Sequence, residues 1–118
     1  MLFKLLSASV LASALTFLTS PVHARTCGAA SWYGPGFHGA ITANGERFNQ
    51  QALTAAHRSL PFGTRLRVVN PSNGRAVTIR VNDDGPAIPG RILDLSAGAF
   101  ARIASLGKGV TTVCFTRL

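Results

Sequence analysis

Acidic residues are scarce in this 118-residue chain, which has four Asp and Glu side chains against twelve Lys and Arg. A surface that used acids for solubility alone would scatter them among the cations. Glu46, Asp83 and Asp84 instead lie beside Asn, Gly or Pro residues, and Asp94 lies within a short apolar stretch. Because turns and loops are where a rigid scaffold presents reactive side chains, these acids are the first candidates for chemistry.

Signatures of metal and cofactor chemistry are also missing from the sequence. His38, His57, Glu46 and Asp83 include potential zinc ligands, but no two of them have the close spacing of a zinc motif. The chain has no Gly-x-Ser-x-Gly elbow of a serine hydrolase. We therefore expect no metal and no cofactor.

Residues 1–24 have the pattern of a cleaved secretory signal peptide. A lysine precedes an apolar run from Leu5 to Phe17, and Val22-His23-Ala24 follows as a small-x-small cleavage site. The run is shorter than the roughly 20 residues that span a membrane. The residues before Cys27 do not resemble a lipobox, so we expect no lipid and no stable membrane anchor. The prediction is a soluble periplasmic protein whose residues 25–118 form one small domain.

Cations in that domain are almost all arginine, and they outnumber the acids. This balance predicts an anionic partner. In an exported protein the candidates are cell-wall polymers, outer-membrane lipid headgroups and extracellular nucleic acid. A cytosolic nucleic-acid regulator is disfavoured by the signal peptide, and the chain has no basic helix or basic run that would form a recognition element.

Cys27 and Cys114 lie near the two ends of the domain, in a compartment that permits disulfides. We expect them to pair, and the loop that the bond closes would stabilise the fold by ~4 kcal/mol. Two buried free thiols are the alternative.

Alternating apolar residues predict a mainly β fold. Residues 65–69 and 76–81 flank the turn sequence Asn70-Pro71-Ser72-Asn73-Gly74, which is typical of a hairpin. Six short strands with one helix indicate a small six-stranded β-barrel. The other four strands are expected over residues 29–33, 52–56, 91–95 and 109–116.

One helix is expected over residues 97–104. Ser96 provides an N-cap, and Gly107 follows where the helix should end. Phe100 and Ile103 would share its buried face.

Several motifs in a fixed order cover nearly the whole domain. They are Ala30-Ser31-Trp32-Tyr33-Gly34, Phe37-His38-Gly39, Thr42-Ala43-Asn44-Gly45-Glu46-Arg47-Phe48, Leu53-Thr54-Ala55-Ala56-His57-Arg58-Ser59-Leu60-Pro61-Phe62-Gly63-Thr64, Val81-Asn82-Asp83 with Gly85-Pro86, and Asp94-Leu95-Ser96. Together they resemble the rare lipoprotein A (RlpA-like) family. The resemblance implies a double-psi β-barrel that acts on peptidoglycan, in members as an endolytic transglycosylase preferring glycan strands stripped of stem peptides.

Carried over by position, the family's active-site acid falls on Asp83, with His57 and Glu46 as companion catalytic residues. Cleavage of a β-1,4 glycosidic bond needs an acid to protonate the departing oxygen. In a lytic transglycosylase the sugar's own 6-hydroxyl is the nucleophile, so one carboxyl first gives a proton and later removes one, and the product is a 1,6-anhydro sugar. The residues predicted to contact the glycan are Trp32, Tyr33, Asn44, Asn82 and Asp84.

Asp84 departs from the family motif, which usually has Arg between the acid and Gly-Pro. If the Asp84 and Asp83 side chains interact, Asp83 is easier to protonate, but contact with an anionic glycan weakens. Adjacent strand residues point to opposite faces, which would limit the interaction.

Structural roles compete with these assignments. Glu46 can accept hydrogen bonds within its turn, and His57 can be a buried histidine with satisfied partners. Asp94 is interpreted as structural, holding a backbone amide or an Arg.

The two aromatic candidates alternate along a strand. Trp32 and Tyr33 therefore cannot face the same way. We expect one to stack on sugar and the other to fill the core.

Two functions fit the sequence. The first is a lytic transglycosylase that cleaves the bond between N-acetylmuramic acid and N-acetylglucosamine in peptide-free strands, with Glu46, His57 and Asp83 in its favour. The alternative is a non-catalytic, expansin-like polysaccharide-binding barrel, and Asp84 in place of the family's Arg favours it. The fold cannot choose between the two, because one barrel supports several functions. Peptidoglycan strands are the expected partner in both, and no division or wall-synthesis protein follows from the sequence.

Overall fold

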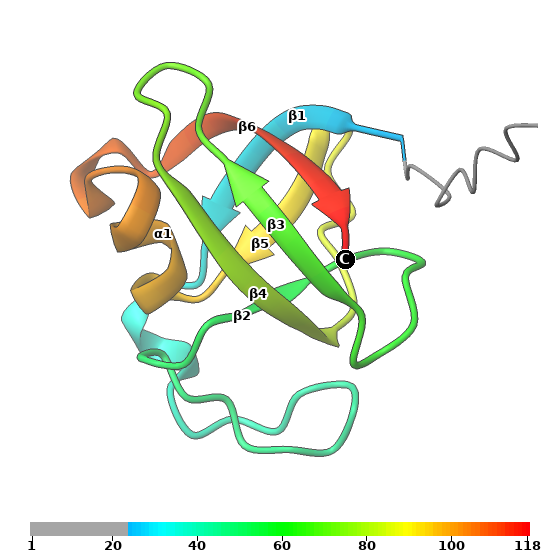
Figure 1. Cartoon of the computed structure of the whole chain (residues 1–118). Coiled ribbons are helices and arrows are strands. Elements are labelled where there is room, and N and C mark those ends of the chain that lie inside the picture. Colours follow the sequence, from blue (N-terminus) through cyan, green and yellow to red (C-terminus); the bar gives the residue numbers. More distant parts are fainter. Residues whose placement is uncertain (1–23) are drawn as a thin grey trace, which may run out of the picture.

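Six strands close into a barrel in the computed structural model, which describes residues 24–118 (Figure 1). The strands are β1 (Thr26–Trp32), β2 (Thr54–Ala56), β3 (Arg65–Val69), β4 (Ala76–Asp83), β5 (Arg91–Leu95) and β6 (Val110–Arg117). Their order around the barrel is β1-β5-β2-β4-β3-β6. The predicted mainly β, six-stranded barrel is confirmed, while residues 1–23 of the predicted signal peptide lie outside the described residues.

Two strand pairs are parallel, β1 with β5 and β2 with β4, and the remaining pairs are antiparallel. Parallel neighbours need long crossover connections rather than tight turns. In a closed six-stranded sheet these crossovers give the double-psi topology that the family resemblance implied.

Alternation of buried and more exposed side chains along β3, and along β4 as far as Val81, builds part of the core. In β3, Leu66 and Val68 point into the barrel while Arg65 and Arg67 are exposed. Strand β4 repeats the pattern, because a half-buried sheet has a side-chain period of two. The fully buried side chains that fill the barrel include Leu66, Val68, Ile79, Val81, Leu93, Leu95 and Val113.

Helix α1 (Ala97–Ile103) lies against the side of the barrel (Figure 1). Its predicted cap is confirmed: the buried Ser96 hydroxyl accepts from the Ala99 amide at 3.1 Å and donates to the Ala52 carbonyl at 2.5 Å. The predicted end at Gly107 is wrong, because the backbone already becomes extended at Ala104 and Gly107 lies in a second short helix, η2 (Leu106–Lys108). No helix among the described residues is long and apolar enough to cross a membrane.

The predicted disulfide is present between Cys27 of β1 and Cys114 of β6. These residues are cross-strand partners with Cα atoms 4.0 Å apart. The bond therefore joins the first and last strands of the barrel.

The connection between β1 and β2 is long and runs along one end of the barrel, below β2 and β4 in Figure 1. It contains the short helix η1 (Pro35–Phe37) and a turn over residues 42–47. Phe48 anchors it, since its side chain is buried and its amide donates to the Ala40 carbonyl at 2.7 Å. This anchoring holds the turn against the end of β4.

Candidate active site

The barrel brings two of the four acids into one row. Ala56 of β2 pairs with Asp83 of β4 on one side and with Asp94 of β5 on the other, and Asp94 pairs in turn with Ser31 of β1. The pairing of β2 with β4 is irregular between Ala55 and Ala56, and the charges of both carboxyls act on the Tyr33 hydroxyl, so both carboxyls lie near that hydroxyl. Two strand spacings place the backbones of Asp83 and Asp94 roughly 10 Å apart.

Asp83 is held by three hydrogen-bond donors. The Tyr33 hydroxyl donates to Oδ2 at 2.9 Å, and the amides of Ala43 and Asp84 each donate to Oδ1 at 2.9 Å. Ala43 belongs to the 42–47 turn, so this contact also fixes the turn to the barrel. Donors on both oxygens fix the orientation of the carboxyl.

Tyr33 follows β1 and faces the two acids. Its ring packs between Phe37 and Phe48, with centroids 5.7 and 4.7 Å away. Burial raises the pKa of the Tyr33 hydroxyl far above its ordinary value, and the bond to Asp83 and the charges of Asp83 and Asp94 raise it further. Tyr33 is therefore a neutral phenol that can donate to one carboxyl while lying within the field of both.

Asp94 is half buried, and its Oδ1 accepts from the Ser31 hydroxyl at 3.0 Å. Burial raises the pKa of the Asp94 carboxyl above the ordinary 3.8, and the charge of Asp83 adds to this effect. The Ser31 hydrogen bond and the charge of Arg91 act in the opposite direction. Asp94 thus holds its proton to higher pH than an exposed aspartate does.

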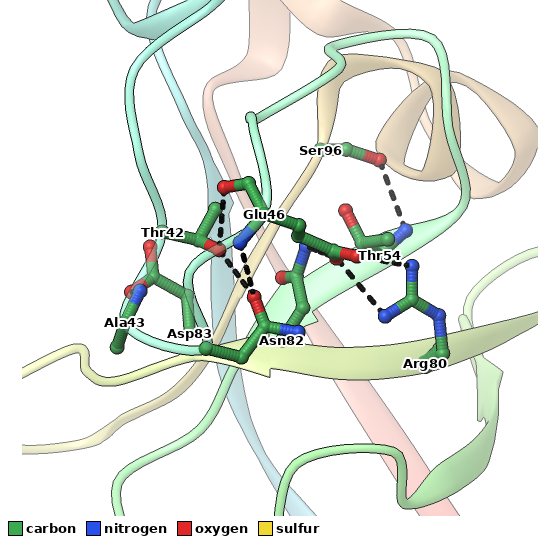
Figure 2. A network of polar contacts seen from close by, with 9 residues as sticks. Thr42, Ala43, Glu46, Thr54, Arg80, Asn82, Asp83 and Ser96 are labelled. Atoms are coloured by element: carbon green, nitrogen blue, oxygen red, sulfur yellow. Dashed lines mark hydrogen bonds and ion pairs between the residues drawn. The ribbon is translucent and has the colours of Figure 1, made fainter.

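Glu46 lies in a polar network at the end of β4, shown in Figure 2. Its carboxylate accepts from Asn82 Nδ2 at 2.6 Å and forms an ion pair with Arg80, whose Nη1 lies 2.9 Å from Oε1. The Asn82 bond, followed by the Arg80 bond, lowers the pKa of Glu46 below 4.5. Glu46 is therefore a charged group near neutral pH, unsuited to donating a proton.

Asn44 and Asn82 connect this network to Asp83. The Asn44 side-chain oxygen accepts from the Thr42 hydroxyl at 2.5 Å and the Glu46 amide at 3.2 Å, and its backbone amide donates to the Asn82 carbonyl at 3.3 Å. Asn82 directly precedes Asp83 and is buried, and its Oδ1 has no partner among residues 24–118. Both side chains are therefore fixed by hydrogen bonds to other residues of the domain, next to Asp83.

His57 joins Asp83 through its backbone and not through its ring. Its amide donates to the Asp83 carbonyl at 3.1 Å. Ring Nδ1 accepts from the amides of Ser59 and Leu60 at 3.1 and 3.0 Å, and the ring edge meets Phe115. Burial lowers the pKa of the imidazole. Within residues 24–118 the His57 ring therefore makes no hydrogen bond to either acid, while its backbone amide helps to position Asp83.

Comparison with known proteins shows to which family the chain belongs. Residues 25–115 match the family described as lytic transglycolase. The chain belongs to this family. A protein of Synechocystis sp. named probable endolytic peptidoglycan transglycosylase RlpA is 64% identical over 86 residues, which is 73% of this chain and 27% of that protein. A Campylobacter jejuni protein named endolytic peptidoglycan transglycosylase RlpA is 57% identical over 86 residues, again 73% of this chain and 31% of that protein.

The chain therefore spans about a quarter to a third of the length of these relatives, and the resemblance to the rare lipoprotein A family is confirmed. Among solved structures, a Streptomyces papain inhibitor superposes with a TM-score of 0.67 at 23% identity, covering 83% of this chain and 97% of the inhibitor. A Clavibacter michiganensis expansin has a TM-score of 0.65 at 24% identity, covering 80% of this chain and 50% of the expansin. These two likenesses establish the shared barrel.

The remaining predicted contact residues of this lytic transglycolase barrel lie apart from one another. The Trp32 indole donates to the Leu106 carbonyl at 3.0 Å and its ring lies 6.5 Å from that of Phe100, so it packs beside α1. The Asp84 side chain is exposed, and its backbone amide serves Asp83. Of the two adjacent aromatics, Tyr33 is the one whose polar group reaches the acids.

Ser31 and Asp94 are the site residues that the sequence interpretation missed. Both lie in motifs of the family resemblance, yet each alternates with apolar neighbours, a pattern that equally fits a structural polar residue. The register of β1, β5, β2 and β4 is what brings Asp94 beside Asp83, and the expected backbone or Arg partner of Asp94 is replaced by the Ser31 hydroxyl. An acid in the last motif, between two buried leucines of a strand, was the available signal.

Proposed function

We propose that this domain is an endolytic peptidoglycan transglycosylase of the periplasm. It cleaves the β-1,4 bond between N-acetylmuramic acid and N-acetylglucosamine in peptide-free glycan strands and leaves a 1,6-anhydro end. The names of the relatives support the substrate and the reaction class. The observation that carries the proposal is the row in which Ala56 separates Asp83 from Asp94.

Asp94 is the proton carrier in this proposal. Burial raises the pKa of its carboxyl, which favours the protonated form relative to an exposed aspartate, and Ser31 occupies only Oδ1. The proton passes to the departing glycosidic oxygen as the bond from that oxygen to C1 breaks. The Asp94 carboxylate then takes the proton of the sugar's 6-hydroxyl while its oxygen bonds to C1. No water is consumed, and Asp94 ends protonated as it began.

Asp83, to which the sequence assigned the proton transfer, stabilises charge in this scheme. Its two oxygens accept hydrogen bonds from Tyr33, Ala43 and Asp84, so its negative charge is fixed in position before substrate arrives. A fixed anion stabilises the positive charge that develops at C1 when the bond breaks. It also raises the proton affinity of Asp94.

Glu46 and His57 are positioning residues. The Glu46 carboxylate orders Asn82 and Arg80 beside Asp83, and the His57 amide holds the Asp83 carbonyl. Because such groups act through the backbone of β4, we expect their loss to lower the rate without abolishing the reaction.

The test is incubation of the purified, oxidised protein with peptide-free glycan strands and with intact sacculi, with products identified by mass spectrometry. An anhydro end is lighter by one water than a hydrolysed end, so the two reactions separate by mass. The proposal expects soluble anhydro fragments that disappear in Asp94→Asn. Binding of the protein to the strands without any fragment would contradict it and leave the expansin-like binding barrel.

A second substrate distinguishes the two acids. In an aryl glycoside the departing phenolate needs no proton, so loss of the proton donor has little effect on its cleavage. We expect Asp94→Asn to lose less of its activity on an aryl muramyl glycoside than on the glycan strand, because only its role as base is still needed, and Asp83→Asn to lose both activities equally. The reverse pattern would return the proton transfer to Asp83.

A further inference from the structure

A cavity of about 500 Å³ opens where the chain leaves β2 and enters β5, the strands that carry Ala56 and Asp94, and neither acid lines it. Its lining includes His57, Arg58, Ser59, Ile88, Arg91 and Ile92. Two contacts tie it to the proposed active site, because the His57 amide is bonded to the Asp83 carbonyl and the charge of Arg91 acts on Asp94. A ligand that crosses the acids can therefore extend into this cavity.

The charge of the cavity wall is positive. Arg58 and Arg91 are its charged residues, and none of the four acids lines it. Within residues 24–118, neither guanidinium makes an ion pair or a side-chain hydrogen bond, whereas Arg80 is neutralised by Glu46. An unpaired guanidinium presents a fork of N–H donors that matches a carboxylate.

His57 adds a third donor to the same wall. Because Nδ1 accepts from the Ser59 and Leu60 amides, the neutral ring carries its proton on Nε2. The ring is held by these two bonds and by the edge contact with Phe115, so its orientation is set before a ligand binds. The His57 ring therefore contributes a donor to the cavity wall, although within residues 24–118 it makes no hydrogen bond to the Asp83 carboxyl.

The rest of the wall is partly apolar. Ile88 is 53% exposed, and Ile92 is partly buried next to the core. An exposed isoleucine beside two arginines suits an anion that is carried on a short aliphatic branch. An inorganic anion would leave this apolar surface without a partner.

We infer that this cavity is a subsite for a carboxylate carried on an aliphatic branch of the peptidoglycan strand that crosses Asp83 and Asp94. The inference rests on the proposed function for the identity of the polymer. Peptidoglycan offers two sources of this group: the free lactyl carboxylate of a muramoyl residue, and a carboxylate of a stem peptide. Arg58 and Arg91 bind the carboxylate, and the isoleucines contact the branch.

Binding is measured by calorimetry in the Asp94→Asn background, which blocks cleavage. Three oligomers of equal length serve as probes: one with free lactyl groups, one with stem peptides, and a chito-oligosaccharide without carboxylates. We expect one of the first two to bind about tenfold or more tightly than the third, because a hydrogen bond between two charged groups is stronger than one between neutral groups. The tighter of the two identifies the source of the carboxylate, and tighter binding of the oligomer with stem peptides would overturn the peptide-free preference in the proposed function.

The variant pair Arg58→Gln and Arg91→Gln, together and singly, should reduce that preference to near unity. Arg75→Gln with Arg102→Gln is the matched control, because it removes two exposed charges from the turn after β3 and from α1, away from the cavity. Equal binding of all three oligomers by the unsubstituted cavity, or a preference that survives in the cavity variant, would overturn the subsite and leave the proposed function intact. Failure of every oligomer to bind would overturn both.

Discussion

Asp83 and Asp94 lie one strand to either side of Ala56, in a row that begins with the Ser31 hydroxyl. They come from different strands, yet the charges of both raise the pKa of Tyr33, and the charge of Asp83 raises the pKa of Asp94. Their surroundings differ, because Asp83 accepts three hydrogen bonds and Asp94 accepts one. Different surroundings allow one carboxyl to act as the proton donor and the other to stabilise charge in the proposed reaction.

Asp94→Asn should stabilise the protein near neutral pH. The pKa of Asp94 is raised in the folded state, so its favourable contribution is complete below the ordinary value of 3.8 and is lost as pH rises through the raised value. Asparagine keeps the Ser31 hydrogen bond and removes the buried charge. Thermal unfolding from pH 4 to pH 8 should therefore show a gain for the variant at pH 7 that shrinks at pH 4. Asp84→Asn is the control, since that side chain is exposed. A gain that does not change with pH would contradict the assignment.

Tyr33→Phe should distinguish the role of the Tyr33 hydroxyl in positioning Asp83 from the role of the Tyr33 ring in packing. Phenylalanine keeps the contacts with Phe37 and Phe48 and deletes only the hydroxyl that donates to Asp83. We expect kcat for anhydro product formation to fall about tenfold to a hundredfold, as for loss of one preorganised donor, with KM little changed. Folding stability should fall by only about 1 kcal/mol. An unchanged kcat would show that Asp83 is oriented sufficiently by its two amide donors.

Glu46→Gln tests whether the polar network acts through Arg80. The two side chains are 36% and 43% exposed, so the ion pair is worth less than about 1 kcal/mol and the melting temperature should change little. The rate should fall, because the charged acceptor of Asn82 is lost beside Asp83. Arg80→Gln should lower the rate by a similar factor, and the double variant should be no worse than either single one. Additive losses in this cycle would assign the two residues separate roles.

Much of the fold follows from local sequence signals. Residues 65–69 and 91–95 are strands with the predicted bounds, and Ser96 caps the helix as predicted. These succeed because side-chain alternation and caps are set by neighbours in sequence. Strand β2 proved shorter than predicted, since only Thr54–Ala56 finds partners on both sides.

The candidate site was harder to predict because it depends on register. The motif correctly points to Asp83 as a candidate. The orientation of the His57 ring could not be predicted, because it is set by hydrogen bonds from the Ser59 and Leu60 amides of the following turn. Asp94 became a site residue only once parallel pairing had set β5 against β1 and β2. No spacing along the chain encodes a distance across the barrel.

The double substitution Cys27→Ser with Cys114→Ser should weaken the fold without damaging the site. The bond joins β1 and β6 across a sequence separation of 87 residues, so its removal frees almost the whole unfolded domain. The chain-entropy relation gives a loss of ~4 kcal/mol. Urea unfolding should show this loss together with a larger m-value, because the unfolded chain becomes less compact. The reduced wild-type protein is the matched control and should unfold at the same urea concentration as the variant.

Activity below the unfolding transition should be kept, since neither cysteine touches Asp83, Asp94 or Tyr33. A loss of stability of less than about 1 kcal/mol would mean that strand pairing, and not the disulfide, closes the barrel.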